Sequence, residues 1–288
     1  MKTTRIDIGP VTLSVTEHGP ESPDAPVVVL LHGFPEHAGS WRYQLPALAA
    51  AGFRVLAPDL RGFRDSDKPV GNEHYTLPTL VDDIRSLLDT LGIEQADIVG
   101  HDWGGVIAWS FAEEYPERTR RLVILDAPHP RLFARQILRS PRQLLRSSYI
   151  LFFQIPWLAE RIITRRRVVE RTFRGWAHRQ AAFDPATMDA YVEAINQPGA
   201  ASATLGYYRA AARSLFGKPF SRSLARPIRA KTLVLWADDD KALGPELLEG
   251  LDELVSDLRI VHIADASHWV QQDQPERVND ALLAFLAG

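Results

Sequence analysis

Short apolar runs alternate with longer segments of helical spacing along most of the chain. Two segments near the start, Thr3–Gly9 and Val11–Glu17, alternate apolar and polar residues across a Gly-Pro pair, which predicts a half-solvated antiparallel hairpin. Later runs are apolar and rich in β-branched residues, as is typical of strands covered on both faces of a sheet. These runs lie at Val27–Leu31, Arg54–Ala57, Asp97–Val99, Leu122–Leu125, Thr232–Trp236 and Arg259–Ile263.

Segments with helical periodicity separate these runs, and Gly, Pro or polar residues bound each of them. The expected helices lie at Trp41–Ala51, Leu77–Leu91, Gly105–Tyr115, Pro245–Ser256 and Pro275–Leu286. Strands that alternate with helices indicate an α/β class, in which crossover helices cover a mostly parallel sheet. The pattern therefore predicts one α/β core.

The alternation stops between about residues 130 and 225, where Arg, Leu and aromatic residues recur at helical spacing without a convincing strand. An insertion between two strands of an open α/β sheet lies near the carboxyl ends of the strands, where such sheets bind ligands. We therefore expect residues 1–130 and 225–288 to form the core and residues 131–224 to form a helical lid over the site.

Composition and charge narrow the possible function classes. The 288 residues include 33 Lys or Arg and 36 Asp or Glu, a net charge of -3 that argues against a nucleic-acid binder. The absence of cysteine excludes disulfides, thiolate zinc sites and a cysteine nucleophile. No stretch approaches the roughly 18 to 20 apolar residues of a membrane span, so we expect no stable membrane insertion. The chain also starts without the apolar run of a secretory signal, and we expect a cytoplasmic protein. We expect it to be a monomer or a homodimer.

The strongest local motif is Val-Gly-His-Asp-Trp-Gly-Gly, which ends one predicted strand and opens a helix. Small residues at Gly100 and Gly104 allow a tight turn that presents the central residue, Asp102, in the manner of a nucleophile elbow. A carboxylate nucleophile displaces a leaving group at carbon and forms an ester with the enzyme. The motif therefore predicts a substrate with a strained or leaving-group-bearing carbon.

Two further segments supply the partners that such a nucleophile needs. The sequence His-Gly-Phe-Pro-Glu follows the strand at residues 27–31, so the backbone N–H groups of Phe34 and Trp103 are candidates for an oxyanion hole. His268 follows the last strand, and Asp240 follows the strand before it, so Asp240 is the expected partner of the histidine. Asp126, at the end of another strand, is the alternative acid.

These motifs together resemble the α/β-hydrolase-fold epoxide hydrolases, which are relatives of the haloalkane dehalogenases. The resemblance covers nearly the whole chain, because its segments occur in family order: HGFPE with SWRYQ, DLRG, GHDWGG, and HWVQQ with QPE. It implies an eight-stranded, mostly parallel sheet with an inserted helical lid. It also implies that two lid tyrosines hydrogen-bond the epoxide oxygen, for which Tyr149 and Tyr208 are the candidates and Tyr207 is the rival of Tyr208.

The function implied by this resemblance is conversion of a hydrophobic small-molecule epoxide to a vicinal diol. Asp102 opens the ring while the tyrosines stabilise the oxygen, and His268 with Asp240 then activates water. No metal or other cofactor is expected. The predicted pocket residues are His32, Pro35, Phe153 and Trp269.

Two other functions stay open at this point. A haloalkane dehalogenase would use the same Asp102, with the indole of Trp103 as one halide donor, but Phe34 offers no side-chain donor for the second. A non-catalytic ligand-binding protein could also use this fold, because function resides in the site and not in the scaffold. The lid carries sixteen of the basic residues and only five of the acidic ones; this charge indicates either a solvated surface or contact with anionic lipid or an acidic ligand.

Overall fold

An eight-stranded sheet forms the centre of the molecule, in a computed structural model that describes residues 1–22, 24–214 and 226–288. The strands are β1 (Lys2–Asp7), β2 (Thr12–His18), β3 (Val27–Leu31), β4 (Arg54–Pro58), β5 (Ala96–His101), β6 (Thr119–Leu125), β7 (Lys231–Ala237) and β8 (Leu258–Ile263). Their order is β1-β2-β4-β3-β5-β6-β7-β8. Only the pairs β1–β2 and β2–β4 are antiparallel, so both the predicted hairpin and the mostly parallel sheet are confirmed.

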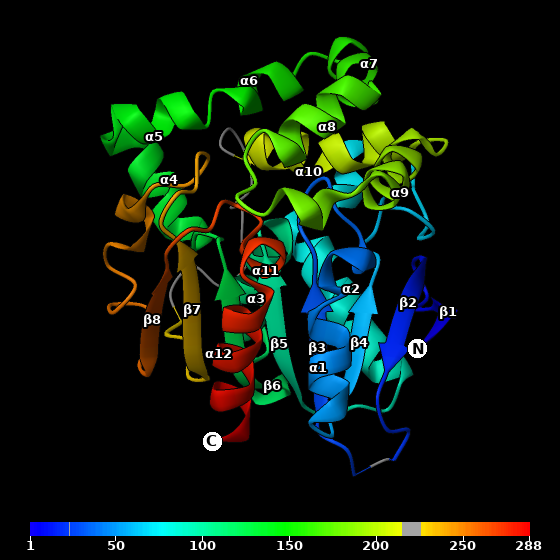
Figure 1. Ribbon diagram of the computed structural model, residues 1–288, viewed down its shortest axis with the longest axis vertical. Coiled ribbons are helices and arrows are strands. Elements are labelled where there is room, and N and C mark those ends of the chain that lie inside the picture. The colour runs from blue at the N-terminus through cyan, green and yellow to red at the C-terminus, as the bar shows by residue number, and fades with distance from the viewer. Residues whose placement is uncertain (23, 215–225) are drawn as a thin grey trace.

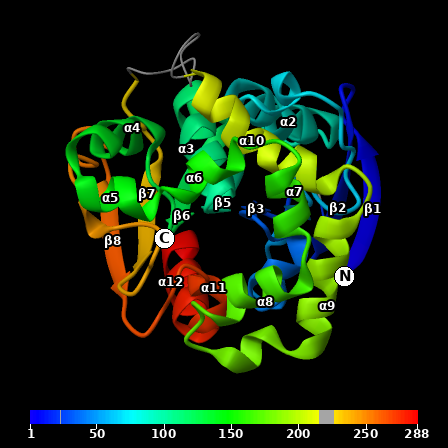
Figure 2. The same cartoon turned by 90° about the horizontal axis from the view of Figure 1, so that it is seen from above.

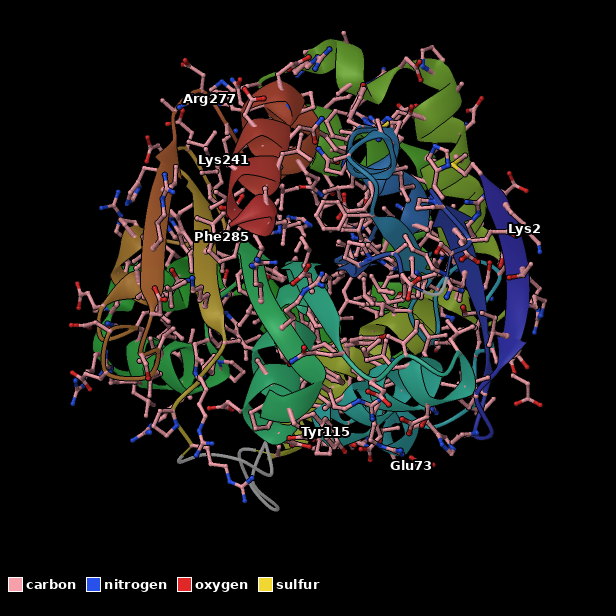
Figure 3. All side chains as sticks on the ribbon, turned by 90° about the horizontal axis from the view of Figure 1, so that it is seen from below. Lys2, Glu73, Tyr115, Lys241, Arg277 and Phe285 are labelled. Carbon is pink, nitrogen blue, oxygen red and sulfur yellow. The ribbon has the colours of Figure 1, made fainter. Side chains whose placement is uncertain are left out.

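Helices cover both faces of the central strands, as their apolar residues require. The prediction that residues 259–263 form a strand covered on both faces is wrong, because β8 lies at the edge of the sheet and only Ile263 of it is buried. The core helices are α1 (Gln44–Ala50), α2 (Leu77–Thr90), α3 (Trp103–Glu114), α11 (Val270–Asp273) and α12 (Pro275–Ala287). Viewed from below, α1 and α12 lie on one face and α2 and α3 on the other, with side chains filling both layers (Figure 3). Alternate residues of β3 belong to two separate cores: Val29 packs with α2 and α3, and Val28 packs with α1 and α12.

Among the described residues seven α-helices lie between β6 and β7 in the chain, and they lie across the carboxyl ends of the strands (Figures 1 and 2). They are α4 (Pro130–Arg139), α5 (Pro141–Arg146), α6 (Tyr149–Phe153), α7 (Leu158–Ile163), α8 (Arg166–Arg174), α9 (Pro185–Asn196) and α10 (Ala200–Ser214). The helical insertion is thus present where the break in the pattern predicts it. The predicted end of the lid, near residue 224, lies outside the described residues.

One helix prediction is wrong. Residues 245–256 do not form a helix but a short 3-10 helix, Pro245–Leu248, followed by turns. Leu247, Leu251 and Val255 are all buried, so their four-residue spacing imitates a helical face. Gly250 has a φ of 85°, a left-handed conformation that breaks a right-handed helix. The other short 3-10 helices are Ala38–Trp41, Asn72–Tyr75, Pro116–Arg118 and Gln180–Phe183.

A buried ion pair fixes the loop after β4 to α2. The guanidinium of Arg61 donates two hydrogen bonds to the carboxylate of Asp83, at 2.7 and 2.5 Å, and the two side chains are only 3% and 5% exposed. Removing one partner leaves the other charge buried without compensation, which is far more destabilising than loss of an exposed pair.

The Asp83→Ala substitution should therefore lower the free energy of unfolding by about 3 to 5 kcal/mol. Asp89 on the same helix forms exposed ion pairs with Arg85 and Arg118, so Asp89→Ala is the matched control and should cost at most about 1 kcal/mol. Urea denaturation followed by circular dichroism measures both. Equal losses for the two variants would contradict this account.

Candidate active site

Asp102 occupies a sharp bend between β5 and α3. Its backbone has φ 49° and ψ -120°, a conformation that residues other than glycine rarely adopt. Glycines make the bend possible: a Cβ on Gly100 would lie 2.4 Å from the carbonyl oxygen of Gly104, and one on Gly104 would lie 2.1 Å from that of Leu31. The turn places the Asp102 carboxylate at the carboxyl edge of the sheet, under the lid.

The imidazole of His268 lies between two carboxylates. Its Nε2 is 3.5 Å from Oδ2 of Asp102, and its Nδ1 is 2.7 Å from Oδ2 of Asp240. The other oxygen of Asp240 accepts hydrogen bonds from the backbone N–H groups of Ala242 and Leu243, at 2.7 and 3.0 Å. These bonds fix the direction of the Asp240 carboxylate and, through it, the orientation of the ring.

Asp126, the alternative acid, has a different environment. One of its oxygens accepts a hydrogen bond from the backbone N–H of Ala237 at 2.7 Å, and the other has no partner within the described residues. Burial, followed by the nearby charge of Asp240, raises the pKa of Asp126 well above its ordinary value. The hydrogen bond to Nδ1 of His268 comes from Asp240, so the geometry favours Asp240 over Asp126.

The two predicted oxyanion donors lie on either side of Asp102. The N–H of Phe34 donates a 2.7 Å hydrogen bond to Oδ1 of Asp102. Trp103 is the first residue of α3, so its N–H belongs to the group at a helix start that lacks intrahelical acceptors. The structure thus gives the Phe34 N–H a direct contact with the carboxylate, and the role of the Trp103 N–H as a second donor stays a prediction.

The two predicted lid tyrosines meet above this carboxylate. Their rings are 6.0 Å apart, and Tyr208 packs edge-on against Phe34 at 5.3 Å and Trp103 at 5.1 Å. Phe153 contacts both tyrosines, at 5.4 and 4.9 Å. Burial, and secondarily the charge of Asp102, raises the pKa of Tyr149, while burial and the neighbouring Tyr149 raise that of Tyr208. Both phenols therefore keep their protons.

Tyr207 and Tyr208 point in different directions although they are neighbours in α10. The hydroxyl of Tyr207 donates a 2.7 Å hydrogen bond to the backbone carbonyl of Arg61, and its ring packs against Phe63 and Tyr75. That hydroxyl is occupied in joining the lid to the loop after β4. The geometry thus favours Tyr208 as the residue that faces Asp102.

Of the remaining predicted pocket residues, Trp269 and Pro35 lie beside site residues, whereas His32 does not. Trp269 packs against His268 with 5.0 Å between ring centroids, and Pro35 directly follows Phe34 in the donor loop. His32 is fully buried and binds backbone on both sides: Nδ1 lies 2.9 Å from the Gly33 carbonyl, and Nε2 accepts from the N–H of Leu60 at 3.0 Å. Its contacts join two loops and give no support for a pocket role.

Sequence reasoning did not single out a buried pair beneath the bend, Glu36 and His101. Nδ1 of His101 is 2.8 Å from the Glu36 carboxylate, and Nε2 is 2.7 Å from the backbone carbonyl of His268. Glu36 also accepts a 2.6 Å hydrogen bond from the amide of Gln272. The pair ties the donor loop, the bend and the histidine loop together. The signal that could have found it is the presence of both residues inside the two strongest motifs.

A second unexpected carboxylate, Asp273, connects the lid to the histidine loop. One of its oxygens accepts the backbone N–H of Arg179 at 2.8 Å, and the other accepts both the N–H and the hydroxyl of Ser267, at 2.9 and 2.6 Å. Trp176, in the same lid segment, packs edge-on against His268 with centroids 6.4 Å apart. The position of the lid and the position of the imidazole are therefore linked.

Neither a metal cluster nor a membrane span is found in the described part of the chain. Residues 1–22, 24–214 and 226–288 contain no group of three or more His, Asp or Glu side chains placed to hold a metal ion. None of their helices is both long enough and apolar enough to cross a bilayer.

Comparisons with known proteins agree with this geometry. The model of the alpha/beta hydrolase fold family matches residues 26–275. Human epoxide hydrolase 4 is 39% identical over 268 residues, which cover 91% of this chain and 72% of the relative. The chain belongs to the α/β-hydrolase family, among the relatives of the epoxide hydrolases. The AB hydrolase superfamily protein YfhM of Bacillus subtilis is also similar, with 37% identity over 96% of this chain and 94% of that protein.

Solved structures of this α/β-hydrolase family give the same picture. An epoxide hydrolase from metagenomes of hot environments superimposes with a TM-score of 0.87 and 37% identity, over 100% of this chain and 99% of that one. A mutant of the Bacillus megaterium epoxide hydrolase, solved with its diol product, gives a TM-score of 0.89 and 28% identity, over 99% and 100% of the two chains. The fold prediction is confirmed.

The electrostatic surroundings of His268 in this α/β hydrolase favour the protonated imidazole when no substrate is bound. Burial works against the charged form of His268, but the charges and hydrogen bonds of Asp240 and Asp102 outweigh it and raise the pKa of His268 well above 6.5. For Asp102, burial is again the largest opposing effect, and His268 outweighs it, so the pKa of Asp102 is lowered. The two groups stabilise each other as an ion pair.

The Asp102→Asn variant should lower the pKa of His268, because an amide keeps the shape of the carboxylate and removes its charge. Titration of the imidazole by nuclear magnetic resonance measures this shift. With a raised pKa in the folded protein, the stabilisation is present at low pH and is lost as the pH rises through that value, so the variant should also lose less stability toward high pH. An unchanged His268 titration would show that Asp102 does not interact with the ring.

Proposed function

We propose that this chain is an epoxide hydrolase that converts an epoxide and water to a vicinal diol through an ester on Asp102. The observation that carries the proposal is that one carboxylate, that of Asp102, lies between a histidine and a pair of tyrosines. Asp102 has an imidazole on one side, and on the other side are two phenols from the lid, Tyr208 buried and Tyr149 partly buried. A nucleophile, a base and acidic donors for a leaving oxygen are the groups that ring opening followed by hydrolysis requires.

In the first step a carboxylate oxygen of Asp102 attacks one carbon of the epoxide, and the bond from that carbon to the ring oxygen breaks. The oxygen leaves as an alkoxide on the same molecule, so it needs a proton donor in place at that moment. Tyr149 and Tyr208 supply hydrogen bonds and one proton, since a phenol is a stronger acid than an alcohol. The product is a hydroxyalkyl ester of Asp102.

Formation of the ester changes the charge around His268. Asp102 loses its negative charge, so only Asp240 still favours the imidazolium, and the pKa of His268 falls. The imidazolium of His268 then loses its proton, and a proton returns to the phenolate that remains after the phenol has protonated the alkoxide. A neutral imidazole held by Asp240 is the base that the second step requires.

In the second step His268 removes a proton from water, and the resulting hydroxide attacks the ester carbonyl carbon. Negative charge develops on the carbonyl oxygen, where the N–H groups of Phe34 and Trp103 can stabilise it. The tetrahedral intermediate expels the diol oxygen, which takes the proton back from His268, and Asp102 is left as a carboxylic acid. Transfer of that acid proton to His268 restores the carboxylate and the imidazolium of the resting state. Apart from the substrate and one water molecule, the groups in these two steps are side chains and backbone N–H groups of this chain.

The His268→Gln variant should trap the first product, because the ester would form without a base to hydrolyse it. Mass spectrometry of the intact protein after incubation with styrene oxide should detect one added substrate mass, located on the peptide that contains Asp102. His262 is the matched control: it is half exposed and pairs with Asp238, so His262→Gln should turn over and accumulate nothing. Release of chloride or bromide from haloalkanes, without diol formation from epoxides, would favour a dehalogenase instead.

The neighbouring tyrosines provide a second test. Phenylalanine at position 208 removes a donor that meets the leaving oxygen, so Tyr208→Phe should slow ester formation about 100-fold, and Tyr149→Phe should act similarly. Tyr207→Phe removes only the hydrogen bond to the Arg61 carbonyl. It should cost about 1 kcal/mol of stability and leave ring opening within a few-fold of wild type. Single-turnover kinetics measure the rate of ester formation in each variant. If Tyr207→Phe formed the ester more slowly than Tyr208→Phe, Tyr207 and not Tyr208 would be the donor to the leaving oxygen.

A further inference from the structure

Large apolar side chains are exposed mainly on one part of the lid. Among the described residues ten large hydrophobic side chains are exposed, and seven of them lie between residues 138 and 158. We call five of these the outer lid surface: Leu144, Leu145, Leu151, Ile155 and Trp157. They belong to α5, α6 and the turn before α7, which form the edge of the molecule farthest from the sheet (Figure 1). A concentration of this kind marks an interaction surface.

Helix α5 reverses the usual pattern of a surface helix. Its polar residue Gln143 is fully buried and bonds the backbone of the loop after Asp240, with 2.9 Å to the Ala242 carbonyl and 3.0 Å from the Gly244 N–H. Leu144 and Leu145 are instead 51% and 74% exposed. An ordinary amphipathic helix buries its leucines. The helix is thus anchored by an amide and presents its apolar residues outward.

Trp157 is held outward by its backbone. It has φ 67° and ψ -47°, and the N–H of Leu158 bonds the carbonyl of Pro156 at 2.7 Å, so a γ-turn of the rare positive-φ type forms around it. Its side chain is 69% exposed, and the guanidinium of Arg161 lies over the ring at 5.7 Å. An exposed indole with a cation beside it suits the boundary between water and lipid, where Trp is enriched.

The chain segment that carries this surface is basic, and the acidic side chains nearest to it have polar or basic partners. Glu246 accepts a hydrogen bond from the hydroxyl of Ser140, and Glu160 pairs with Arg209. Residues 127–159 contain five arginines and neither Asp nor Glu. Arg139, Arg142, Arg165 and Arg167 are exposed, and within the part of the chain described by the structure none of their guanidinium groups has a hydrogen-bond or ion-pair partner. Clusters of arginine beside exposed apolar residues bind anionic phospholipid surfaces.

We propose that the outer lid surface docks reversibly on an anionic lipid membrane. The apolar side chains enter the headgroup boundary, and the surrounding arginines bind lipid phosphates. A second copy of the chain is a poorer occupant, because an isologous contact would bring the same unpaired arginines face to face. Docking there would place the lid, and the site beneath it, against a phase in which apolar molecules dissolve. The binding itself does not depend on the epoxide chemistry.

Cosedimentation with vesicles tests the proposal on the full chain. Wild type should bind phosphatidylcholine vesicles that contain phosphatidylserine, should bind pure phosphatidylcholine much less, and should be released by salt. Leu145→Gln with Leu151→Gln should weaken binding at least roughly tenfold. Val70 is 93% exposed and lies outside the lid, so Val70→Gln is the apolar control and should bind as wild type.

The charge arm uses substitutions of exposed arginines. Each of Arg142→Gln and Arg165→Gln should weaken binding roughly fivefold, and Arg259→Gln on β8 is the control that should not. Thermal unfolding of each variant verifies that it is folded, and wild-type salt dependence tests the charge contribution without any substitution. Binding that is equal on neutral and anionic vesicles, or equal in all variants, overturns the proposal. If the wild type does not bind vesicles, and sedimentation velocity shows a dimer that the same substitutions dissociate, the surface binds a second copy of the chain instead.

Discussion

The strained bend at Asp102 is the constraint on which the rest of the site depends. A left-handed backbone at a non-glycine residue costs free energy, and the surrounding chain has to supply it. Three glycines make the bend sterically possible: Gly33, Gly100 and Gly104. Each lacks the Cβ that would collide with the bend or with the strand beside it. A Cβ on Gly33 would lie 2.4 Å from the Cβ of Asp102 itself. Close approach of β3, β5 and α3 is what brings the Phe34 N–H to the carboxylate.

The fold then converts that one position into a linked system. His101, next to Asp102, bonds Glu36 on one side and the carbonyl of His268 on the other, so hydrogen bonds connect the bend to the histidine loop. The lid is tied to the same loop through Asp273. Charge completes the coupling, because the ion pair of Asp102 and His268 exists only while the carboxylate is ionised. Geometry holds the groups together, and in the proposed reaction the charge state of Asp102 sets the protonation state of His268.

The sequence predicts the core well, and it points to site residues that the structure brings together, because both follow short-range rules. Buried parallel strands are continuous apolar runs, and a residue placed between a strand and a helix with glycines on both sides has few alternatives. The predictions of Asp102, His268 and Asp240 each follow from a position after a strand, and the structure brings these three side chains together. Glu36 and His101 were missed because a buried polar residue within a motif looks the same in sequence as a solvated one.

Other features depend on tertiary contacts that no local pattern encodes. The spacing of Leu247, Leu251 and Val255 imitates a helix, yet Gly250 takes a left-handed turn there. Neighbouring Tyr207 and Tyr208 differ only in which face of α10 they occupy, and the partner of Tyr207 is a carbonyl 146 residues away in the chain. The exposed leucines of α5 likewise follow from the burial of Gln143 against a loop of the core.

The central claim is that the carboxylate oxygen of Asp102 is transferred to the product. A single turnover of excess enzyme in water labelled with heavy oxygen tests it directly, by mass spectrometry of both the diol and the peptide that contains residue 102. The account predicts an unlabelled diol and one heavy oxygen in Asp102, since water attacks the ester carbonyl and not the substrate carbon. A labelled diol with an unlabelled Asp102 would mean that water opens the ring directly, and would contradict the account.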